Sequence, residues 1–228
     1  MRMAAPETTD EFFEFIRRSE FVCVGAKSAL SRNNIEVYLA RDIRSAWDDV
    51  AISQRLISFA HKYSENAEPF RSFVVLFEQS GDMSEAAFEE ALWDRVQSLS
   101  NKDAMHGQNY DARVSSDPDD PHFSLSFGGE GFFVVGLHPR ASRAARRFKC
   151  AALAFNLHDQ FELLRESGHY EKLRSSILTR DESFNGSVNP MLSRHGEASE
   201  ARQYSGRAVG GDWRCPFDPK QRKFYDAL

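Results

Sequence analysis

The sequence has no apolar run long enough to cross a membrane, which takes about 20 consecutive apolar residues as a helix. The N-terminal stretch MRMAAPETTDEFF lacks the apolar segment of a secretory signal peptide and becomes acidic at once. Cysteine is scarce: Cys23, Cys150 and Cys215 are widely separated and odd in number, so they do not form a disulfide framework. These absences predict a cytoplasmic protein with reduced thiols and no membrane contact.

The chain also has fewer basic residues than acidic residues. The formal net charge is −5 and the isoelectric point is near 5.8, which argues against nucleic acid as a partner because such proteins usually carry a basic surface. No linker rich in proline, glycine or serine divides the 228 residues, so we expect a single domain over residues 1–228. The sequence contains enough apolar residues for a substantial core, since 41% of the residues are hydrophobic and 19 are phenylalanine.

Hydrophobic periodicity predicts a mixed α+β fold with a central sheet of about five strands and helices packed on it. Gly128-Gly129 lies between the third and fourth expected strands and indicates a β-hairpin. The C-terminal region has little periodicity but contains Tyr204, Trp213 and Phe217, so we expect an irregular segment wrapped over the body. The expected strands are Ile35–Ala40, Ser72–Phe77, Phe123–Phe127, Phe132–Leu137 and Ala151–Phe155.

Three helices are predicted with specific boundaries or buried faces. The first spans Glu11–Arg18. The second runs from Asp42 to about Tyr63, with a buried stripe that includes Trp47 and Val50. The third is capped by Ser84. Its expected buried residues are Phe88, Ala91, Leu92, Val96 and Leu99.

Carboxylates are missing from Gly131 to His158, although the whole chain is acidic, and this gap contains a cluster of cations. Ser142 is predicted to cap a helical turn that presents Arg143, Arg146 and Arg147 on one face. Guanidinium groups bind carboxylates and phosphates through paired hydrogen bonds, so this face is a candidate anion site. The alternative is a solvated basic face paired with acidic loops such as Asp117–Asp120.

Two histidines flank the cationic segment. His138 ends an expected strand, and His158 lies in the first turn of a helix that Asn156 is predicted to cap. Each is a candidate metal or heme ligand, a proton carrier, or a hydrogen-bonded core residue. No spacing of cysteine, histidine or aspartate completes a tetrahedral zinc site.

The cysteines are candidate thiolate ligands or small packed residues. Cys215 follows an arginine and precedes a proline, and a neighbouring cation favours the thiolate form. Cys23 lies in the apolar run Phe21–Val24, which indicates burial. No base is identifiable beside any cysteine, which weakens the case for cysteine catalysis.

Several segments together resemble the YqcI/YcgG family over most of the chain. The longest is the region from Gly136-Leu137-His138-Pro139 to Gln160-Phe161-Glu162, which includes Ser142-Arg143 and Arg146-Arg147-Phe148. Cys23-Val24-Gly25-Ala26, Gln203-Tyr204-Ser205-Gly206 and Trp213-x-Cys215-Pro216-Phe217 also match the family's pattern.

The resemblance implies a heme-dependent oxygenase. Several members of the family bind heme b and hydroxylate a nitrogen of a free amino acid, typically the guanidino nitrogen of arginine or a derivative, in natural product biosynthesis. The implied partners are a small amino-acid-like substrate, O₂ or peroxide, and an electron donor, with a homodimer as a candidate assembly. The alternative is a non-catalytic module that binds a phosphorylated or other anionic metabolite.

On this hypothesis each candidate residue has a role. Arg143, Arg146 and Arg147 would bind the heme propionates, and Ser142 and Asn156 are further candidate cofactor-binding residues. His158 is the first choice for the axial iron ligand and His138 the second, with Cys23 and Cys215 as thiolate alternatives. Glu162, one turn after His158, would orient a ligand or the substrate.

Overall fold

The computed structural model describes residues 7–191 and 196–226, with side chains up to residue 222. Within these residues a five-stranded sheet has the order β1-β2-β5-β4-β3. β1 and β2 are parallel, and all other neighbours are antiparallel. The strands are β1 (Ile35–Ala40), β2 (Ser72–Phe77), β3 (Leu125–Phe127), β4 (Glu130–Leu137) and β5 (Ala151–Leu157).

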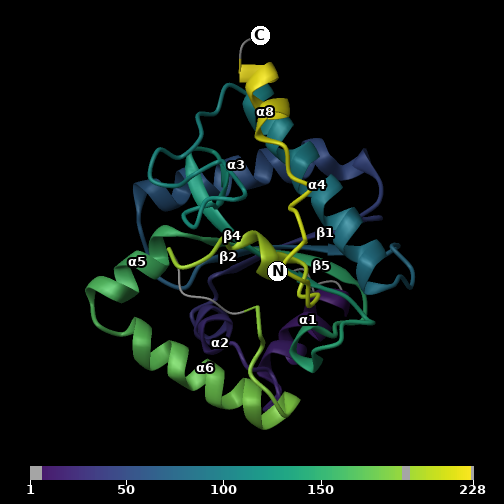
Figure 1. The fold of residues 1–228 in the computed structure, drawn as a ribbon, viewed down its shortest axis with the longest axis vertical. Helices are drawn as coiled ribbons and strands as arrows, with labels where there is room; N and C mark the ends of the chain where they lie inside the picture. Colours follow the sequence, from purple (N-terminus) through teal and green to yellow (C-terminus); the bar gives the residue numbers. More distant parts are fainter. Residues whose placement is uncertain (1–6, 192–195, 227–228) are drawn as a thin grey trace, which may run out of the picture.

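Helices cover both faces of the sheet (Figure 1). On one side lie α3 (Asp49–Glu65), α4 (Glu85–Met105) and α8 (Pro219–Asp226); on the other lie α1 (Glu7–Arg17), α2 (Val24–Ser31), α5 (Asp159–Glu166) and α6 (Tyr170–Asn185). The predicted α+β class, with one central sheet and packed helices, is confirmed. None of the described helices is long and apolar enough to span a bilayer.

The two faces of the sheet carry side chains of very different size. Alternate residues of a strand point to opposite faces, and β5 places Leu153 and Phe155 toward α3 and α4, where they join the larger core cluster. The same strand places Ala152 and Ala154 toward the opposite face. Because small side chains fill little volume, space remains between this face and its helices.

The hairpin between β3 and β4 is confirmed. Gly128 and Gly129 adopt φ values of 60° and 81°, the left-handed region that a two-residue hairpin turn requires and that glycine enters without steric cost. Leu125 pairs with Phe132 and Phe127 with Glu130. Since β3 is short, no described strand pairs with β4 on this side beyond Phe132.

Helix α4 follows the prediction closely. The Ser84 Oγ accepts a hydrogen bond from the Ala87 N–H at 3.2 Å, and all five expected core positions are buried. The buried Arg95 forms an ion pair with Asp49, at the start of α3, at 2.8 Å. This pair fixes the two helices against each other.

The prediction for α3 is wrong at its beginning. A 3-10 turn, Ala46–Asp48, precedes the helix, which starts only at Asp49. The tighter turn shifts the helical phase, so Trp47 and Val50 are 71% and 54% exposed. The bounds of the first helix also differ, since α1 spans Glu7–Arg17 and not Glu11–Arg18.

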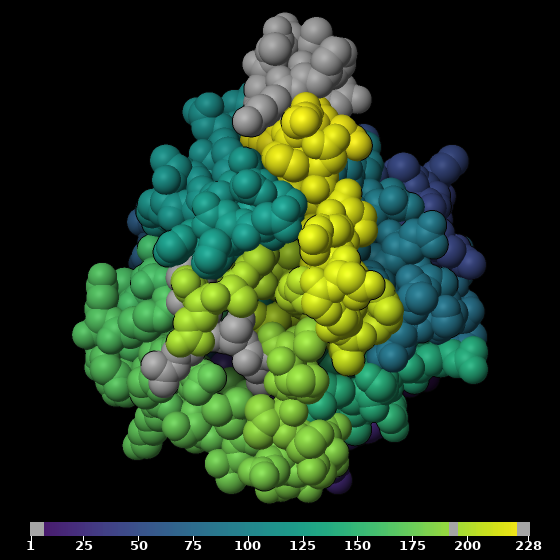
Figure 2. All heavy atoms as spheres, viewed as in Figure 1, coloured from purple at the N-terminus to yellow at the C-terminus, as the bar shows by residue number. Residues whose placement is uncertain are grey.

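The C-terminal segment wraps over the body, as expected, and contributes to the core. It crosses the front of the molecule beside α4 and the loop before β3 (yellow in Figure 2). Tyr204, in the short helix α7 (Ala201–Tyr204), is fully buried, and Phe217 is 3% exposed. Arg222 fixes its end by donating to the Ser100 carbonyl and the Asp103 carboxylate, both at 2.9 Å.

The hairpin gives a matched pair of substitutions. A Cβ at Gly128 would lie 2.8 Å from the Ala60 Cβ and 3.0 Å from the Ile57 Cα, whereas a Cβ at Gly129 meets nothing within 4 Å. Gly129→Ala therefore adds only backbone strain, about 1 kcal/mol, and Gly128→Ala adds overpacking for a total of about 3 kcal/mol. Urea unfolding measures both, and equal losses would contradict the close approach of the hairpin to α3.

Candidate functional site

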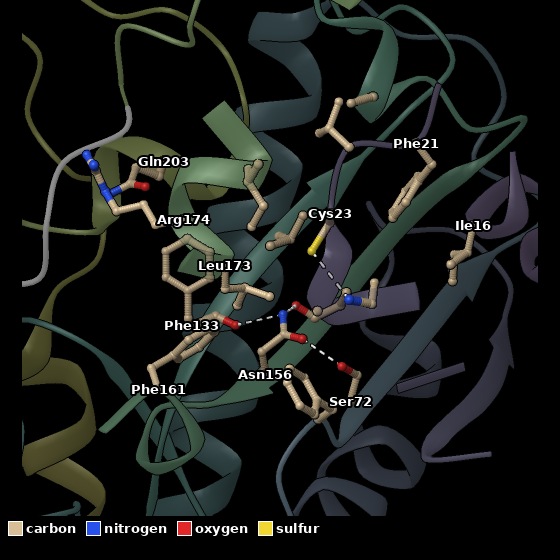
Figure 3. A pocket seen from close by; sticks show the side chains of 18 of the residues that line it. Ile16, Phe21, Cys23, Ser72, Phe133, Asn156, Phe161, Leu173, Arg174 and Gln203 are labelled. Atoms are coloured by element: carbon tan, nitrogen blue, oxygen red, sulfur yellow. Dashed lines mark hydrogen bonds between the residues drawn. The ribbon is translucent and has the colours of Figure 1, made fainter. Parts of the chain in front are cut away.

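A cavity of about 310 Å³ lies between the small-residue face of the sheet and helices α2, α5 and α6 (Figure 3). Its walls are mainly aliphatic and aromatic, and its volume is at the lower end of the range for small-molecule sites. The apolar lining residues are Phe12, Ile16, Phe21, Val22, Ile35, Phe70, Val74, Phe133, Val135, Leu137, Ala154, Phe161, Leu164, Leu173, Ile177 and Leu178.

Asn156 lies in the sheet wall of the cavity and not at a helix cap. It belongs to β5, and α5 begins three residues later at Asp159, so the capping prediction is wrong. Its Oδ1 accepts a hydrogen bond from the Ser72 Oγ at 2.7 Å, and its Nδ2 donates to the Phe133 carbonyl at 3.4 Å (Figure 3). These bonds fix the polar part of an otherwise apolar wall.

Cys23 faces the cavity from the start of α2 (Figure 3). Its side chain caps the helix, since the Sγ accepts from the Ala26 N–H at 3.4 Å. Burial raises the pKa of the thiol, while the amides of Ala26 and Gly25 and the nearby Arg146 cation oppose that shift. Backbone N–H groups would therefore stabilise a Cys23 thiolate. A metal or another cation bound in the cavity would offset the cost of burying that negative charge.

His158 lies in the cavity wall with a carboxylate beside it. It immediately precedes α5 and is 7% exposed, and its backbone N–H donates to the Gly131 carbonyl at 2.8 Å. Its Nε2 is 3.9 Å from the Oε1 of Glu200, which is also buried. The two side chains form an acid–base pair at the cavity.

The arginine cluster does not form the predicted face. A short 3-10 turn, Ala144–Arg146, takes the place of the expected helical turn, and no side-chain cap from Ser142 is formed. The Arg143 guanidinium donates to the Asp181 carboxylate at 2.7 Å, and Arg147 donates to the carbonyls of Ala141 and Ser142 at 2.6 and 2.7 Å. Arg143 and Arg147 therefore bind different protein acceptors.

Arg146 closes the free edge of β4. Its Nη1 donates to the Gly136 carbonyl at 3.0 Å and to the Tyr204 carbonyl at 3.2 Å, and its Nη2 donates to the Gln203 carbonyl at 3.1 Å. Burial lowers the pKa of this guanidinium to about 10, and it still carries a positive charge near neutral pH. It holds α7 against the strand and forms part of the cavity wall.

Several predicted site residues lie away from the cavity. His138 is 1% exposed on the opposite side of the sheet and stacks on Phe88 at 4.4 Å between ring centroids. Burial lowers its pKa, as expected of a neutral core histidine. Glu162 forms an ion pair with Arg165 and is not among the lining residues. Cys215 packs against the larger core cluster, where burial raises its pKa to about 12.

Four charged lining residues were not identified as site residues from the sequence: Arg165, Arg174, Asp181 and Glu200. Glu200 reaches the cavity from the turn that precedes α7, and Arg174 reaches it from α6. Among the described residues Arg174 makes no ion pair, and it lines the cavity together with Gln203 (both labelled in Figure 3). Neither Glu200 nor Arg174 lies in a recognisable sequence motif. The nearest indication in the sequence is Gln203, which belongs to a segment that resembles the family.

Comparison with known proteins gives one family match. The model described as the YqcI/YcgG family matches residues 12–218. No curated protein and no solved structure matches the chain significantly. The matched range includes all of the lining residues named above.

The role of Arg146 can be measured as stability. Arg146→Ala removes three hydrogen bonds from a charged donor and leaves carbonyls at the β4 edge and in α7 without it, so we expect a loss of about 3 kcal/mol in the free energy of unfolding. The matched control is Arg140→Ala, whose side chain is 62% exposed and which should change stability by about 0.5 kcal/mol or less. Equal effects in urea titrations would show that Arg146 does not hold α7.

Proposed function

Because the chain belongs to the YqcI/YcgG family, we propose that its cavity binds heme b and that the protein hydroxylates a nitrogen of a small amino-acid-like substrate. The observation that carries this proposal is the Cys23 sulfur, which faces an apolar cavity from the N-terminus of a helix. We place the protein in the cytoplasm, where its three cysteines stay reduced.

The lining residues fit heme in three respects. Cys23 and His158 are both side-chain types that ligate heme iron, and both line the cavity. The remaining walls are mainly apolar, as a porphyrin requires. Arg143, Arg146 and Arg165 line the cavity but bind protein acceptors, so Arg174, which makes no ion pair among the described residues, replaces the cluster as the candidate partner of a propionate.

The cavity is smaller than a heme group, and we infer that α6 moves outward to enlarge it. Asp181 is the only residue of α6 that is classed as buried, and a helix with so few buried side chains moves at low cost. Asp181 binds Arg143, and it also accepts from the Asn189 N–H at 2.7 Å. These contacts fix the C-terminal end of α6, while its N-terminal end follows the turn at Gly168.

Cys23 replaces His158 as the favoured axial ligand. The Sγ points into the cavity and accepts backbone N–H bonds, which stabilise a thiolate. The Nε2 of His158 instead lies near Glu200, so this pair is better placed to bind the substrate and to hold or release a proton. Glu200 takes the role first assigned to Glu162, that of a carboxylate for a cationic substrate group.

The reaction balances with either oxidant. Bound heme supplies the activation of oxygen. With peroxide, one oxygen atom is transferred to the substrate nitrogen and the other leaves as water. With O₂, two electrons and two protons are needed in addition. The protein's own contribution is to hold the nitrogen near Glu200 and to exclude bulk water through the apolar walls.

The alternative, a binding module for anionic metabolites, has less support from the geometry. It was based on one arginine face, and Arg143, Arg146 and Arg147 instead donate to protein acceptors. A colourless protein that gives no spectral change with hemin would favour this alternative over the heme proposal.

A hemin titration of single variants tests the proposal. The unmodified protein should develop a sharpened Soret band at stoichiometric hemin, and its reduced CO complex should absorb at the long wavelength typical of thiolate ligation. Cys23→Ser should lose that CO band, because a hydroxyl does not replace the thiolate. Cys215→Ser is the matched control, since Cys215 is half-buried and lies outside the cavity lining.

The same spectra identify the alternative ligand. If His158→Ala removes the Soret change while Cys23→Ser retains it, the ligand is His158 and the thiolate assignment is wrong. His169→Ala, an exposed histidine, is the control for that comparison. A folded protein with no Soret change at all would contradict the heme proposal itself.

Substrate binding provides a separate test of Glu200. Glu200→Gln keeps the shape of the side chain and removes its charge, so it should raise the KM for a cationic amino acid about tenfold, which corresponds to about 1.4 kcal/mol. Glu162→Gln is the matched control and should leave KM unchanged. Equal KM values for both variants would exclude Glu200 from substrate recognition.

A further inference from the structure

Three redox-active aromatic side chains form a contiguous row through the core. Trp213 contacts Trp93 with a ring-centroid separation of 6.3 Å, and Trp93 stacks on Tyr204 at 5.7 Å with an interplanar angle of 25°. Trp93 is 2% exposed and Tyr204 is fully buried. Adjacent indole and phenol rings at such separations exchange single electrons readily.

One end of this row reaches the cavity. Tyr204 packs edge-on against Phe133 at 5.3 Å, and Phe133 lines the cavity. This contact is possible because α7 lies beside the free edge of β4, where Arg146 binds the carbonyls of both Gly136 and Tyr204. Tyr204 thus connects the aromatic core on the α4 side with the cavity on the other side of the sheet.

The other end of the row reaches the surface. Trp213 is half-buried and lines a separate crevice of about 280 Å³, together with Pro118, Asp119 and Arg202. The Arg202 guanidinium lies 5.6 Å from the centre of the Trp213 ring. A small reductant in this crevice would contact the first ring of the row.

We propose that Trp213, Trp93 and Tyr204 form an electron relay between the surface crevice and the cavity. The physiological direction rests on the proposed heme function: an oxidised centre in the cavity removes an electron from Tyr204, Trp93 and then Trp213 refill the vacancy in turn, and a small one-electron reductant in the crevice, such as an enediol, reduces the resulting Trp213 radical. This relay returns electrons to the cavity when no substrate is bound, and it protects the protein from oxidation.

The protons follow from the surroundings of each ring. Trp93 keeps its proton during transfer, because its buried Nε1 has no hydrogen-bond partner among the described residues. Trp213 exchanges its proton with water. The Tyr204 hydroxyl donates to the Phe132 carbonyl at 3.3 Å and also lies beside the Ser124 hydroxyl. When Tyr204 loses an electron, its phenolic proton passes to the Ser124 oxygen while Ser124 gives its own proton to the Glu200 carboxylate, 3.5 Å away. Each one-electron transfer is therefore accompanied by a defined fate for the proton of the ring that is oxidised.

The relay can be tested without heme by pulse radiolysis. Azide radicals remove one electron from accessible tryptophan and become azide anions, so Trp47→Phe is used as the background to leave Trp213 as the accessible indole. We expect the indolyl radical absorption to decay in a first-order process while the phenoxyl absorption of Tyr204 grows at the same rate. The rate should not depend on protein concentration.

Variants identify each member of the row in that background. Tyr204→Phe should abolish the growth of the phenoxyl signal, whereas Tyr63→Phe, another buried tyrosine, should retain it. Trp213→Phe should remove the initial indolyl signal, and Trp93→Phe should slow the transfer. If Trp93→Phe fails to fold, as judged by circular dichroism, the Trp213 and Tyr204 variants still decide the proposal. Persistent indolyl radicals without phenoxyl growth would overturn it.

Connection to the cavity is tested in hemin-loaded protein treated with peroxide and a nitroso spin trap. Mass spectrometry should locate the trapped adduct on Trp213, and Tyr204→Phe should abolish it. An adduct that persists in Tyr204→Phe would show that the relay does not serve the cavity. If the protein binds no hemin, the heme proposal fails, while the radiolysis experiment still decides whether the three rings transfer electrons.

Discussion

The hydrogen bonds of Arg146 to the carbonyls of Gly136, Gln203 and Tyr204 connect three parts of the molecule that are distant in sequence. Strand β4 needs such a contact because β3 begins only at Leu125, so that the backbone acceptors of β4 beyond Phe132 have no partner in a described strand on this side. The Arg146 side chain binds an acceptor of β4 and also binds the carbonyls of α7, so α7 lies at the sheet edge. The cavity gains a wall there, and Tyr204 gains a position between the two faces of the sheet.

The second constraint is the unequal filling of the two sheet faces. Large aromatic residues pack tightly against α3 and α4, whereas the alanines of β5 leave room on the opposite side. A close-packed interior has few voids larger than a water molecule, so a lined cavity of about 310 Å³ is the candidate binding site. Its charged groups, Glu200 and Arg174, are supplied by segments that contribute little to the main core.

Periodicity in the sequence is sufficient to predict the strands, the hairpin and the buried face of α4, because each depends on neighbours within a few residues. It fails at Asp42–Asp48, where a 3-10 turn changes the helical phase, and at Ser142–Arg147, where tertiary hydrogen bonds replace an α-helical turn. His138 and His158 illustrate the same limit for the site. Both follow strands, but one faces the packed core and the other faces the cavity, and the side of a sheet that a terminal residue takes depends on packing.

The proposed heme function requires that Cys23 hold the iron in the cavity. The most direct test is a crystal structure of the hemin complex, with the iron located from its anomalous scattering. We expect one iron peak in the cavity, bonded to the Cys23 Sγ. An iron peak elsewhere, or crystals of hemin-treated protein with an empty cavity, would contradict it.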